Sequence, residues 1–297
     1  MVGGTAWTMT NRKNIAENAF DLLVIDEAGQ FCLANTVAVG RAARTLLLLG
    51  DPQQLPQVSQ GSHPEPVDAS ALGWLADGAD TLPADRGWFL ATTRRMHPDV
   101  CRVVSDLSYE GRLRAHESVD DRSLDGVAPG VHTTFVDHVG NATSSREEAD
   151  EVVRLARSVI GRTWRTGAES RPLESADVLV VAAYNAQVAV IRAALDAAGL
   201  TDTACGTVDR FQGREAAVVI VSMAASAPED VPRGMPFLLS RNRINVALSR
   251  GQWVSYVVRS PALTHYLPGT PVELSLLGAF MRVSPDLVQP KVRPSPR

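Results

Sequence analysis

The chain has 297 residues, of which 45% are hydrophobic, and its formal charge is -4 with 29 basic and 33 acidic side chains. This length predicts about two domains of roughly 150 residues each, and the apolar content is sufficient for packed cores. The charge excludes a broadly basic surface for nucleic acid, so any such binding must use a local groove.

The cysteines and the apolar runs further limit the class of protein. Cys32, Cys101 and Cys205 lack the paired spacing of a zinc site, and an odd number of cysteines disfavours a disulfide framework. Residues 1–13 lack the apolar core of a signal peptide, and no run approaches the roughly 20 apolar residues that span a bilayer. We therefore expect a soluble, cytoplasmic protein with no membrane partner.

The first part of the chain alternates between predicted strand and predicted helix. Apolar runs predict buried strands over 21–26 and 45–50, with a helical connection over 33–44. This βαβ rhythm is typical of a parallel sheet. Residues 52–83 are rich in Pro, Gly, Asp and Ser, which indicates a long surface excursion and then a junction. The first domain is therefore predicted to span 1–85.

Residues 86–270 are predicted to form a second α/β domain. In chain order, we expect strands over 88–91, 131–137, 177–184, 218–223 and 253–258, and helices from Pro98 and over 144–164, 187–198 and 242–250. Ser144 and Ser145 provide a hydroxyl cap for one helix, and the acids Glu147 and Glu148 suit its first turn. Residues 271–297 are predicted to be a short helix, 274–281, and a Pro-rich tail.

Polar side chains follow the two predicted strands of the first domain. Asp26 and Glu27 come directly after the run 22–25, and Gln54 lies shortly after the run 46–49. Ligands bind at this edge of open α/β sheets. An aspartate can hold Mg²⁺, a neighbouring glutamate can orient an attacking water, and a glutamine amide can bond a terminal phosphate. Taken alone, the acid pair is equally consistent with capping of the next helix.

Two arginines in the second domain supply the opposite charge. Arg95 lies in the stretch 93–98 and Arg250 follows the predicted helix over 242–250. Arginine stabilises charge that is spread over phosphoryl oxygens, because its planar fork donates two bonds at once. Each arginine alone is typical of a surface residue, but their combination with the acid pair favours a nucleotide site.

A glycine-punctuated turn, 206–215, stands between these arginines in the sequence. Its backbone amides, with Thr207 and Arg210, are suited to a sugar-phosphate backbone, and Glu215 is suited to a nucleotide ribose. The alternative for this segment is an ordinary hairpin.

The blocks DEAGQ, GDPQQLPQV, RRMHP, GTVDRFQGRE and NVALSRG resemble motifs II to VI of superfamily 1 helicases. The residues within these motifs most resemble the branch that includes the nonsense-mediated-decay helicase and its DNA-acting relatives. The resemblance extends from Gly3-Gly4-Thr5 to Arg250. The resemblance implies an α/β fold with two RecA-like parallel-sheet domains in tandem, the first incomplete. It also implies an ATP-dependent 5′ to 3′ helicase that uses ATP and Mg²⁺.

By that resemblance, a role is implied for each matching residue. Asp26 would hold Mg²⁺, Glu27 would activate water, Gln54 would sense the γ-phosphate, and Arg95 and Arg250 would act as arginine fingers. The nucleotide would further contact Arg94, Gln212, Gly213 and Glu215, and the nucleic acid would contact Thr5, Pro56, Thr207 and Arg210. Arg94 replaces the family's usual aromatic residue, so its guanidinium plane would have to stack on adenine.

The phosphate-cradling loop of such an enzyme is missing from the sequence. The only lysines are Lys13 and Lys291, and neither lies in a G-x-x-x-x-G-K-[ST] (Walker A) motif. We therefore expect the C-terminal ATPase and translocase portion of a helicase, weakly active or inactive as an isolated chain. A missing N-terminal segment or a partner would bring the phosphate loop.

The expected track is single-stranded nucleic acid, with DNA favoured over RNA. The alternatives are a hydrolysis-deficient nucleic-acid-binding module and one half of a split helicase. Residues 63–68 also resemble bacterial proteins that fuse a RecB-like nuclease ahead of such a helicase.

Overall fold

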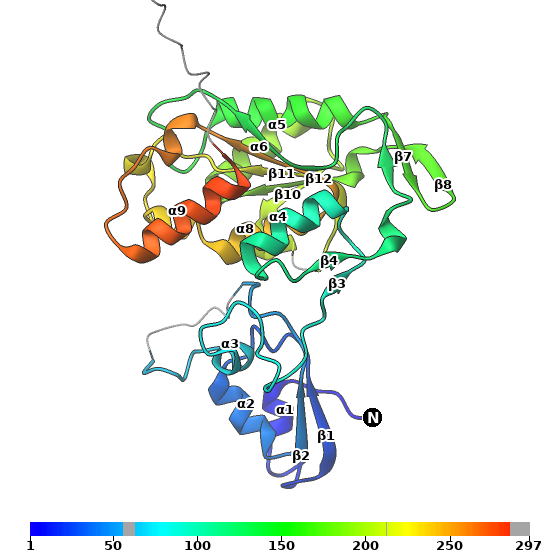
Figure 1. The fold of residues 1–297 in the computed structure, drawn as a ribbon, viewed down its shortest axis with the longest axis vertical. Coiled ribbons are helices and arrows are strands. Elements are labelled where there is room, and N and C mark those ends of the chain that lie inside the picture. The colour runs from blue at the N-terminus through cyan, green and yellow to red at the C-terminus, as the bar shows by residue number, and fades with distance from the viewer. Residues whose placement is uncertain (56–62, 212, 286–297) are drawn as a thin grey trace, which may run out of the picture. The chain divides into compact units, whose positions relative to one another are not determined.

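The structure is a computed structural model that describes residues 1–55, 63–211 and 213–285. The chain divides into two compact units, each of which is described by itself (Figure 1). The first unit comprises Met1–Ala91 together with Ser108–Arg112. The second comprises Thr92–Leu107 and the described residues from Leu113 onward. The chain therefore passes between the units at three places along its length.

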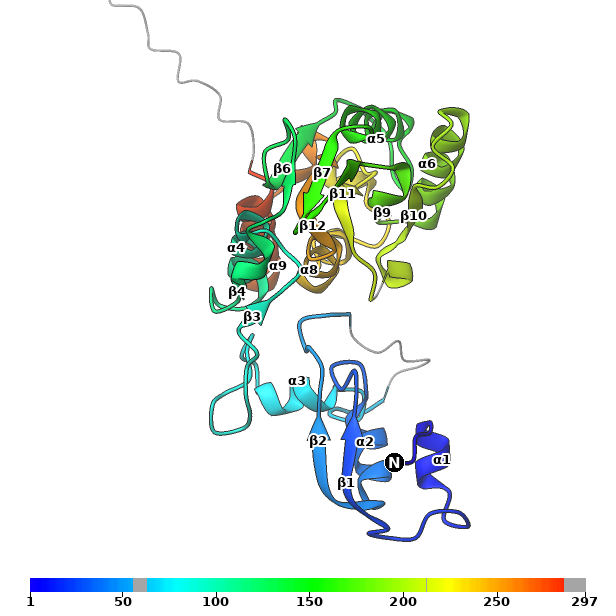
Figure 2. The same ribbon diagram turned by 90° about the vertical axis from the view of Figure 1, so that its right-hand side faces the viewer.

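The first unit is built on a parallel pair of strands. Strand β1 (Phe20–Ile25) pairs with β2 (Ala43–Leu48), in register from Phe20 opposite Ala43 to Ile25 opposite Leu48. Helix α2 (Leu33–Gly40) is the crossover between them, and α1 (Ala6–Thr10) lies on the same side of the strands (Figure 2). Helix α3 (Ala71–Ala76) completes the unit. The predicted βαβ rhythm is thus present.

Only one face of this two-stranded sheet is buried. Leu23 and Ile25 pack with residues of α1 and α2, whereas Leu22 and Val24 on the opposite face are 51% and 47% exposed. The expectation that β1 is a buried strand is therefore wrong for its outer face. Among the described residues, β1 pairs with β2 alone, and the side chains of Leu22 and Val24 remain accessible to solvent.

The second unit contains a five-stranded parallel sheet of order β10-β9-β11-β12-β6. Its strands are β6 (Gly130–Phe135), β9 (Val178–Ala182), β10 (Ala204–Thr207), β11 (Ala216–Ser222) and β12 (Gly251–Arg259). The central strands β9 and β11 are buried along their whole length. Continuous apolar runs are what a parallel sheet covered on both faces requires.

Helices cover both faces of this sheet (Figure 2). One face carries α5 (Arg146–Val159) and α6 (Asn185–Ala197), and the other carries α4 (Pro98–Ser108), α8 (Arg241–Leu248) and α9 (Pro271–Val283). The predicted cap of α5 is present, because the Ser145 side chain accepts a hydrogen bond from the Glu148 N–H at 3.1 Å. No helix in the described ranges is both long and apolar enough to cross a bilayer.

The remaining elements are short. They are β3 (Thr92–Thr93) paired with β4 (Arg114–Ala115), the antiparallel set β5 (Ser123–Leu124), β7 (Thr163–Thr166) and β8 (Glu169–Pro172), helix α7 (Met235–Leu238), and the 3₁₀ turns Glu117–Val119, Ser175–Asp177, Val208–Phe211, Pro228–Asp230 and Pro261–Thr264.

Three sequence-based expectations for the predicted second domain, 86–270, differ from the structure. Residues 88–91 form no strand, and Trp88 and Leu90 are largely exposed. The helix expected over 144–164 ends at Val159, because Gly161 adopts a φ of +83° and the chain then turns into β7. The first two residues of the predicted turn 206–215 belong instead to strand β10 (Ala204–Thr207), whose neighbour is β9 rather than β11. The 206–215 segment is therefore a crossover and not a hairpin.

Candidate nucleotide and nucleic-acid sites

The acid pair of the first unit lies directly after β1. The carboxylate of Asp26 accepts a hydrogen bond from the Glu27 N–H at 2.9 Å, and both side chains are exposed. Glu27 has a φ of +54°, in the left-handed region that a non-glycine residue seldom adopts. Such strained positions cluster at functional sites, so this one is consistent with a functional loop.

The loop after β1 contacts the loop after β2. The Ala28 N–H donates to the Leu49 carbonyl at 2.8 Å, and a Cβ placed on Gly29 would lie 2.2 Å from the Asp51 carbonyl oxygen. A Cβ on Gly50 would lie 2.7 Å from the Ala28 nitrogen. Glycine at both positions allows the two backbones to approach, and this contact brings the Asp26-Glu27 loop beside the loop that carries Gln54.

Gln54 is held by the carboxylate of Asp51. Its Nε2 donates to Asp51 Oδ2 at 3.2 Å, while the Gln53 N–H donates to Asp51 Oδ1 at 2.9 Å. Leu55 is buried with 6% exposure and anchors the end of the described loop. Pro56, predicted to contact nucleic acid, lies outside the described residues.

In the second unit, Arg95 and Glu215 meet at the amino edge of the sheet. Arg95 Nε donates to Glu215 Oε2 at 2.7 Å, and its Nη1 donates to the Ser249 carbonyl at 3.3 Å. Gln252 Nε2 donates to the other carboxylate oxygen of Glu215 at 2.8 Å. Glu215 directly precedes β11, and Ser249 and Gln252 flank the start of β12, so parallel pairing of these strands brings the group together.

The charge of Glu215 is stabilised by its arginine neighbours. Burial acts to raise the pKa of this carboxyl, but the hydrogen bond and charge of Arg95, with smaller contributions from Gln252 and Arg122, outweigh it and lower the pKa. Arg122 also donates to the backbone carbonyls of Arg94 and Arg95. Sequence reasoning missed Arg122 and Gln252, because neither belongs to a recognisable motif.

Arg250 lies at the same amino edge and is buried with 2% exposure. Its Nε donates to the Val246 carbonyl at 3.1 Å and its Nη1 to the Arg214 carbonyl at 3.5 Å. The structure therefore brings Arg95, Glu215 and Arg250 to one edge of one sheet. Arg94, in contrast, is exposed beside His116, with 3.4 Å between its Nη1 and the ring Nδ1.

The predicted nucleic-acid contacts of the second unit begin at the opposite, carboxyl edge. Thr207 is the last residue of β10, and Arg210 is exposed in the 3₁₀ turn that follows. Thr207 and Glu215 thus start and finish a segment that crosses from one sheet edge to the other. Gly213, with a φ of +78°, is exposed within it, and Gln212 lies outside the described residues. In the first unit, Thr5 caps α1 by accepting from the Thr8 N–H at 3.4 Å.

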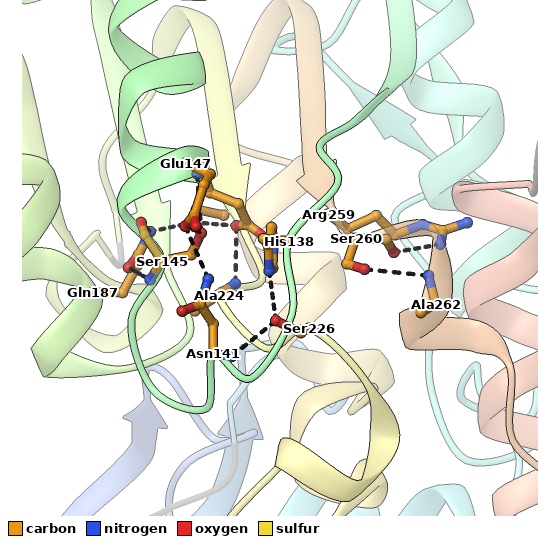
Figure 3. Close-up of polar contacts among 12 residues, drawn as sticks. His138, Asn141, Ser145, Glu147, Gln187, Ala224, Ser226, Arg259, Ser260 and Ala262 are labelled. Carbon is orange, nitrogen blue, oxygen red and sulfur yellow. Dashed lines mark hydrogen bonds and ion pairs between the residues drawn. The ribbon is translucent and has the colours of Figure 1, made fainter.

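A buried polar network underlies the carboxyl edge of the second sheet (Figure 3). The fully buried Glu148 carboxylate accepts from the Ser222 hydroxyl at 2.6 Å and from the Ala224 N–H at 2.9 Å, and its Oε1 lies 3.1 Å from His138 Nε2. The side-chain amide of Gln187 donates to the Ser222 hydroxyl and to the Ser145 carbonyl, and it accepts from the Ser145 N–H. Glu148 therefore not only places a negative charge in the first turn of α5 but also bonds the end of β11 and the turn that follows it.

Asp26 fits the predicted magnesium ion. Mg²⁺ bound with a nucleotide takes one or two protein carboxylates and completes its octahedral shell with phosphate oxygens and water. An exposed carboxylate at a strand end, as Asp26 provides, meets that requirement. Within the described ranges, no group of three or more His, Cys, Asp or Glu side chains forms a protein-only metal site.

The chain matches two protein-family models, which together cover most of its length. A family model described as an AAA domain matches residues 80–261, and a second model of the same description matches residues 4–60. The chain belongs to the superfamily 1 helicases. It lies in the branch that the sequence motifs indicated, the one that includes the nonsense-mediated-decay helicase.

Similar proteins include the DNA-binding protein SMUBP-2 of Rattus norvegicus, which is 30% identical over an alignment of 254 residues that covers 81% of this chain and 25% of that protein. The DNA polymerase alpha-associated DNA helicase A of Schizosaccharomyces pombe is 29% identical over 78% of this chain and 36% of its own length. The chain thus spans about a quarter to a third of these relatives. A solved PRRSV helicase is 17% identical, with a TM-score of 0.40, over 80% of this chain and 34% of its own.

Proposed function

We propose that this chain is the ATP-hydrolysing and strand-binding portion of a helicase that moves 5′ to 3′ along single-stranded DNA. The observation that carries the proposal is the gathering of Arg95, Glu215 and Arg250, from distant parts of the sequence, at one edge of the second sheet. The names of several relatives support DNA as the nucleic acid that is bound. One relative is named 5'-3' DNA helicase ZGRF1 of Mus musculus, and this name supports the direction of movement. That protein is 28% identical over 78% of this chain and 12% of its own length.

The proposed hydrolysis divides its tasks between the two units. Asp26 would hold Mg²⁺, which when bound neutralises charge on the phosphates. Glu27 orients the attacking water, and Gln54 donates to the terminal phosphate. Arg95 and Arg250 donate to the phosphoryl oxygens as negative charge spreads over them. Positioning and charge stabilisation are nearly the whole of catalysis in phosphoryl transfer, so each of these residues is required.

The nucleotide and the strand use separate parts of the second unit. Glu215, released from Arg95, bonds the ribose, with Gln212 and Gly213 beside it, and the exposed guanidinium of Arg94 stacks on adenine. Thr207 and Arg210 contact strand phosphates from the carboxyl edge, and Thr5 does so from the first unit with Pro56. The segment from Thr207 to Glu215 connects the two ligands, because it begins at one sheet edge and ends at the other.

The first unit is proposed to gain its phosphate loop from another segment or chain. A groove of about 760 Å³ runs along β1 and is lined by Met1–Thr5 and by β1 residues that include the exposed Leu22 and Val24. An unpaired strand edge and an apolar face are what a further strand would cover. A Walker A segment paired with β1 would end beside Asp26, at the carboxyl edge where phosphates bind in such sheets.

The test is ATP hydrolysis with and without single-stranded DNA, measured on the chain alone and after addition of a polypeptide that carries a Walker A loop. We expect little hydrolysis by the chain alone and DNA-stimulated hydrolysis once the loop is supplied. Glu27→Gln should reduce the stimulated rate at least about 100-fold while DNA still binds. Brisk hydrolysis by the chain alone would contradict the need for an added loop.

A hydrolysis-deficient nucleic-acid-binding module is the competing function. It predicts DNA binding without hydrolysis in every preparation, and no effect of Glu27→Gln or Arg250→Ala on that binding. Binding that responds to ATP in the unaltered chain, and loses that response in Arg250→Ala, would exclude it.

A further inference from the structure

One short turn of the chain belongs to the first unit although its neighbours on both sides belong to the second. Ser108–Arg112 clusters with the first unit, whereas Thr92–Leu107 and the residues from Leu113 onward cluster with the second. The turn is tight: the Arg112 N–H donates to the Tyr109 carbonyl at 2.8 Å, and Glu110 and Gly111 have φ values of +54° and +71°.

The hydroxyl of Tyr109 is hydrogen-bonded to the Asp51 carboxylate, which also accepts a hydrogen bond from the Gln54 amide. Tyr109 Oη donates to Asp51 Oδ2 at 2.6 Å, and the same oxygen accepts from Gln54 Nε2 at 3.2 Å. An ionised carboxylate only accepts hydrogen bonds, so the nitrogen of the Gln54 amide must face it. That nitrogen carries two N–H groups, and the bond to Asp51 fixes the direction of the second.

A second set of contacts holds the same turn to the same loop. Gln53 Nε2 donates to the Asp80 carbonyl at 2.9 Å, and the Glu110 carboxylate accepts from the Asp80 N–H at 3.3 Å and from the Thr81 hydroxyl at 2.6 Å. These hydrogen bonds lower the pKa of Glu110, the Thr81 hydroxyl most of all, against the opposing effect of burial. Tyr109 is 9% exposed and lies against Phe89, with 6.0 Å between ring centroids.

The turn is the direct continuation of the helix that follows Arg95. Helix α4 begins at Pro98, three residues after Arg95, and ends at Ser108, immediately before Tyr109. It has 11 residues and therefore spans roughly 16 Å as one rigid element. Arg95 and the turn that holds Gln54 are thus covalently attached to opposite ends of α4.

We propose that Tyr109 is a positioning residue for Gln54, and that the turn 108–112 couples the γ-phosphate sensor to the helix that follows the arginine finger. This inference rests on the proposed function. Because Tyr109 directly follows α4, a displacement of α4 would shift the Tyr109 hydroxyl at Asp51 and change the orientation of the Gln54 amide toward a phosphoryl oxygen. Tyr109 acts through the carboxylate of Asp51, which orients Gln54.

The test compares Tyr109→Phe with Tyr266→Phe in the ATPase preparation that is active. Phenylalanine keeps the contact with Phe89 and removes only the hydroxyl; the hydroxyl of Tyr266, within the described part of the chain, has no hydrogen-bond partner and serves as the control. We expect Tyr109→Phe to lower kcat about tenfold, the effect of losing one hydrogen bond to a charged group in the transition state, with KM for ATP unchanged. Tyr266→Phe should match the unaltered protein.

Two further measurements separate positioning from structural support. In a Gln54→Ala background, Tyr109→Phe should have no additional effect on kcat, because the Gln54 side chain through which Tyr109 acts is already absent. Without nucleotide, Tyr109→Phe should raise amide hydrogen exchange over residues 50–55 and leave β1, β2 and β9 unchanged. An unchanged kcat, multiplicative effects in the double variant, unchanged exchange over 50–55, or faster exchange throughout β1 and β2 would each overturn the proposal.

These outcomes are distinct from failure of the proposed function. If no preparation hydrolyses ATP, or if Glu27→Gln leaves hydrolysis intact, the proposed function fails and the positioning role of Tyr109 fails with it. If hydrolysis depends on Glu27 and Gln54 but not on the Tyr109 hydroxyl, the proposed function stands and only the inference fails.

Discussion

Two glycines decide whether the loops after β1 and β2 can meet. At Gly29 the missing Cβ leaves room for the Asp51 carbonyl, and at Gly50 it leaves room for the Ala28 nitrogen. Gly50 also has a φ of +155°, which other residues rarely adopt, whereas at Gly29 the close approach of the backbones alone is the reason for glycine. The residue after Glu27, Ala28, is fixed by its N–H to the Leu49 carbonyl, so the backbone on that side of the left-handed position is anchored to the loop after β2.

Gly29→Ala should therefore separate the two loops. We expect it to destabilise the first unit by about 1–3 kcal/mol, as overpacking does, and to reduce loop-dependent ATP hydrolysis more than tenfold. Urea unfolding and the ATPase assay check this. Gly278→Ala is the control, since a Cβ there meets no atom within 4 Å and the residue lies inside α9, where alanine is favoured. Equal stability of the two variants would contradict the steric explanation.

The buried thiols should be unreactive in the folded protein. Burial raises the pKa of Cys101 to about 11 and that of Cys205 to about 11. Only on the order of 0.1% of each thiol is then ionised at pH 8, and thiolate is the reactive form. We expect iodoacetamide at pH 8 to modify Cys32, which is partly exposed, before either buried thiol. Mass spectrometry of peptides from the labelled protein measures this, and equal labelling of all three would contradict it.

At the scale of elements, the carboxylate of Glu148 joins three parts of the second unit. Glu148 lies in the first turn of α5, Ser222 ends β11, and Gln187 of α6 is bonded to both Ser222 and Ser145. Ala224 has a φ of +69° and its N–H donates to Glu148, so the turn after β11 depends on this carboxylate. The network fixes how two helices sit over the sheet edge.

Glu148→Ala should remove this support and leave its partners unsatisfied. We expect the free energy of unfolding of the second unit to fall by about 3 kcal/mol, because loss of one partner strands several buried polar groups. Glu151→Ala on the same helix is the control. It breaks the pair with Arg154, whose side chain is 62% exposed, and should cost no more than about 1 kcal/mol. Chemical denaturation measures both, and equal losses would show that burial of the network contributes nothing.

At the scale of the whole molecule, the two units differ in how completely they are built. The second has a five-stranded sheet with both faces covered, whereas the first has a two-stranded sheet with exposed leucine and valine side chains on one face. A two-stranded sheet that buries one face gains little from the hydrophobic effect, so its opening requires less free energy than opening of the larger core.

Amide hydrogen exchange should therefore distinguish the units. We expect amides of β1 and β2 to exchange at least about tenfold faster than those of β9 and β11. Addition of a Walker A polypeptide that pairs with β1 should slow exchange in β1 and have no direct effect on β9. Equal protection in both sheets, or no response of β1 to the added polypeptide, would contradict the incomplete-sheet interpretation.

Local patterns in the sequence predicted most of the fold. The apolar runs that became β9 and β11 are uninterrupted, and the cap at Ser145 is a local hydrogen bond, so both could be recognised without tertiary information. Strand β10 was missed because its residues, Ala204–Thr207, are neither bulky nor strongly apolar. Its strand conformation depends on pairing with β9, which is a contact between distant parts of the sequence.

The sequence by itself determined the family and the identity of the candidate residues. Each motif is a short run of consecutive residues that follows or precedes a strand, so it can be recognised without tertiary contacts. Only the tertiary structure decided which of them meet: Arg95 with Glu215 near Arg250 at one edge, and Tyr109 with Asp51 and Gln54 in the first unit. Tyr109 carries no motif signal, since its partner is 58 positions away and is reached only when the chain folds back. Side-chain pairing across such separations is set by strand order and packing, and the sequence does not display either one.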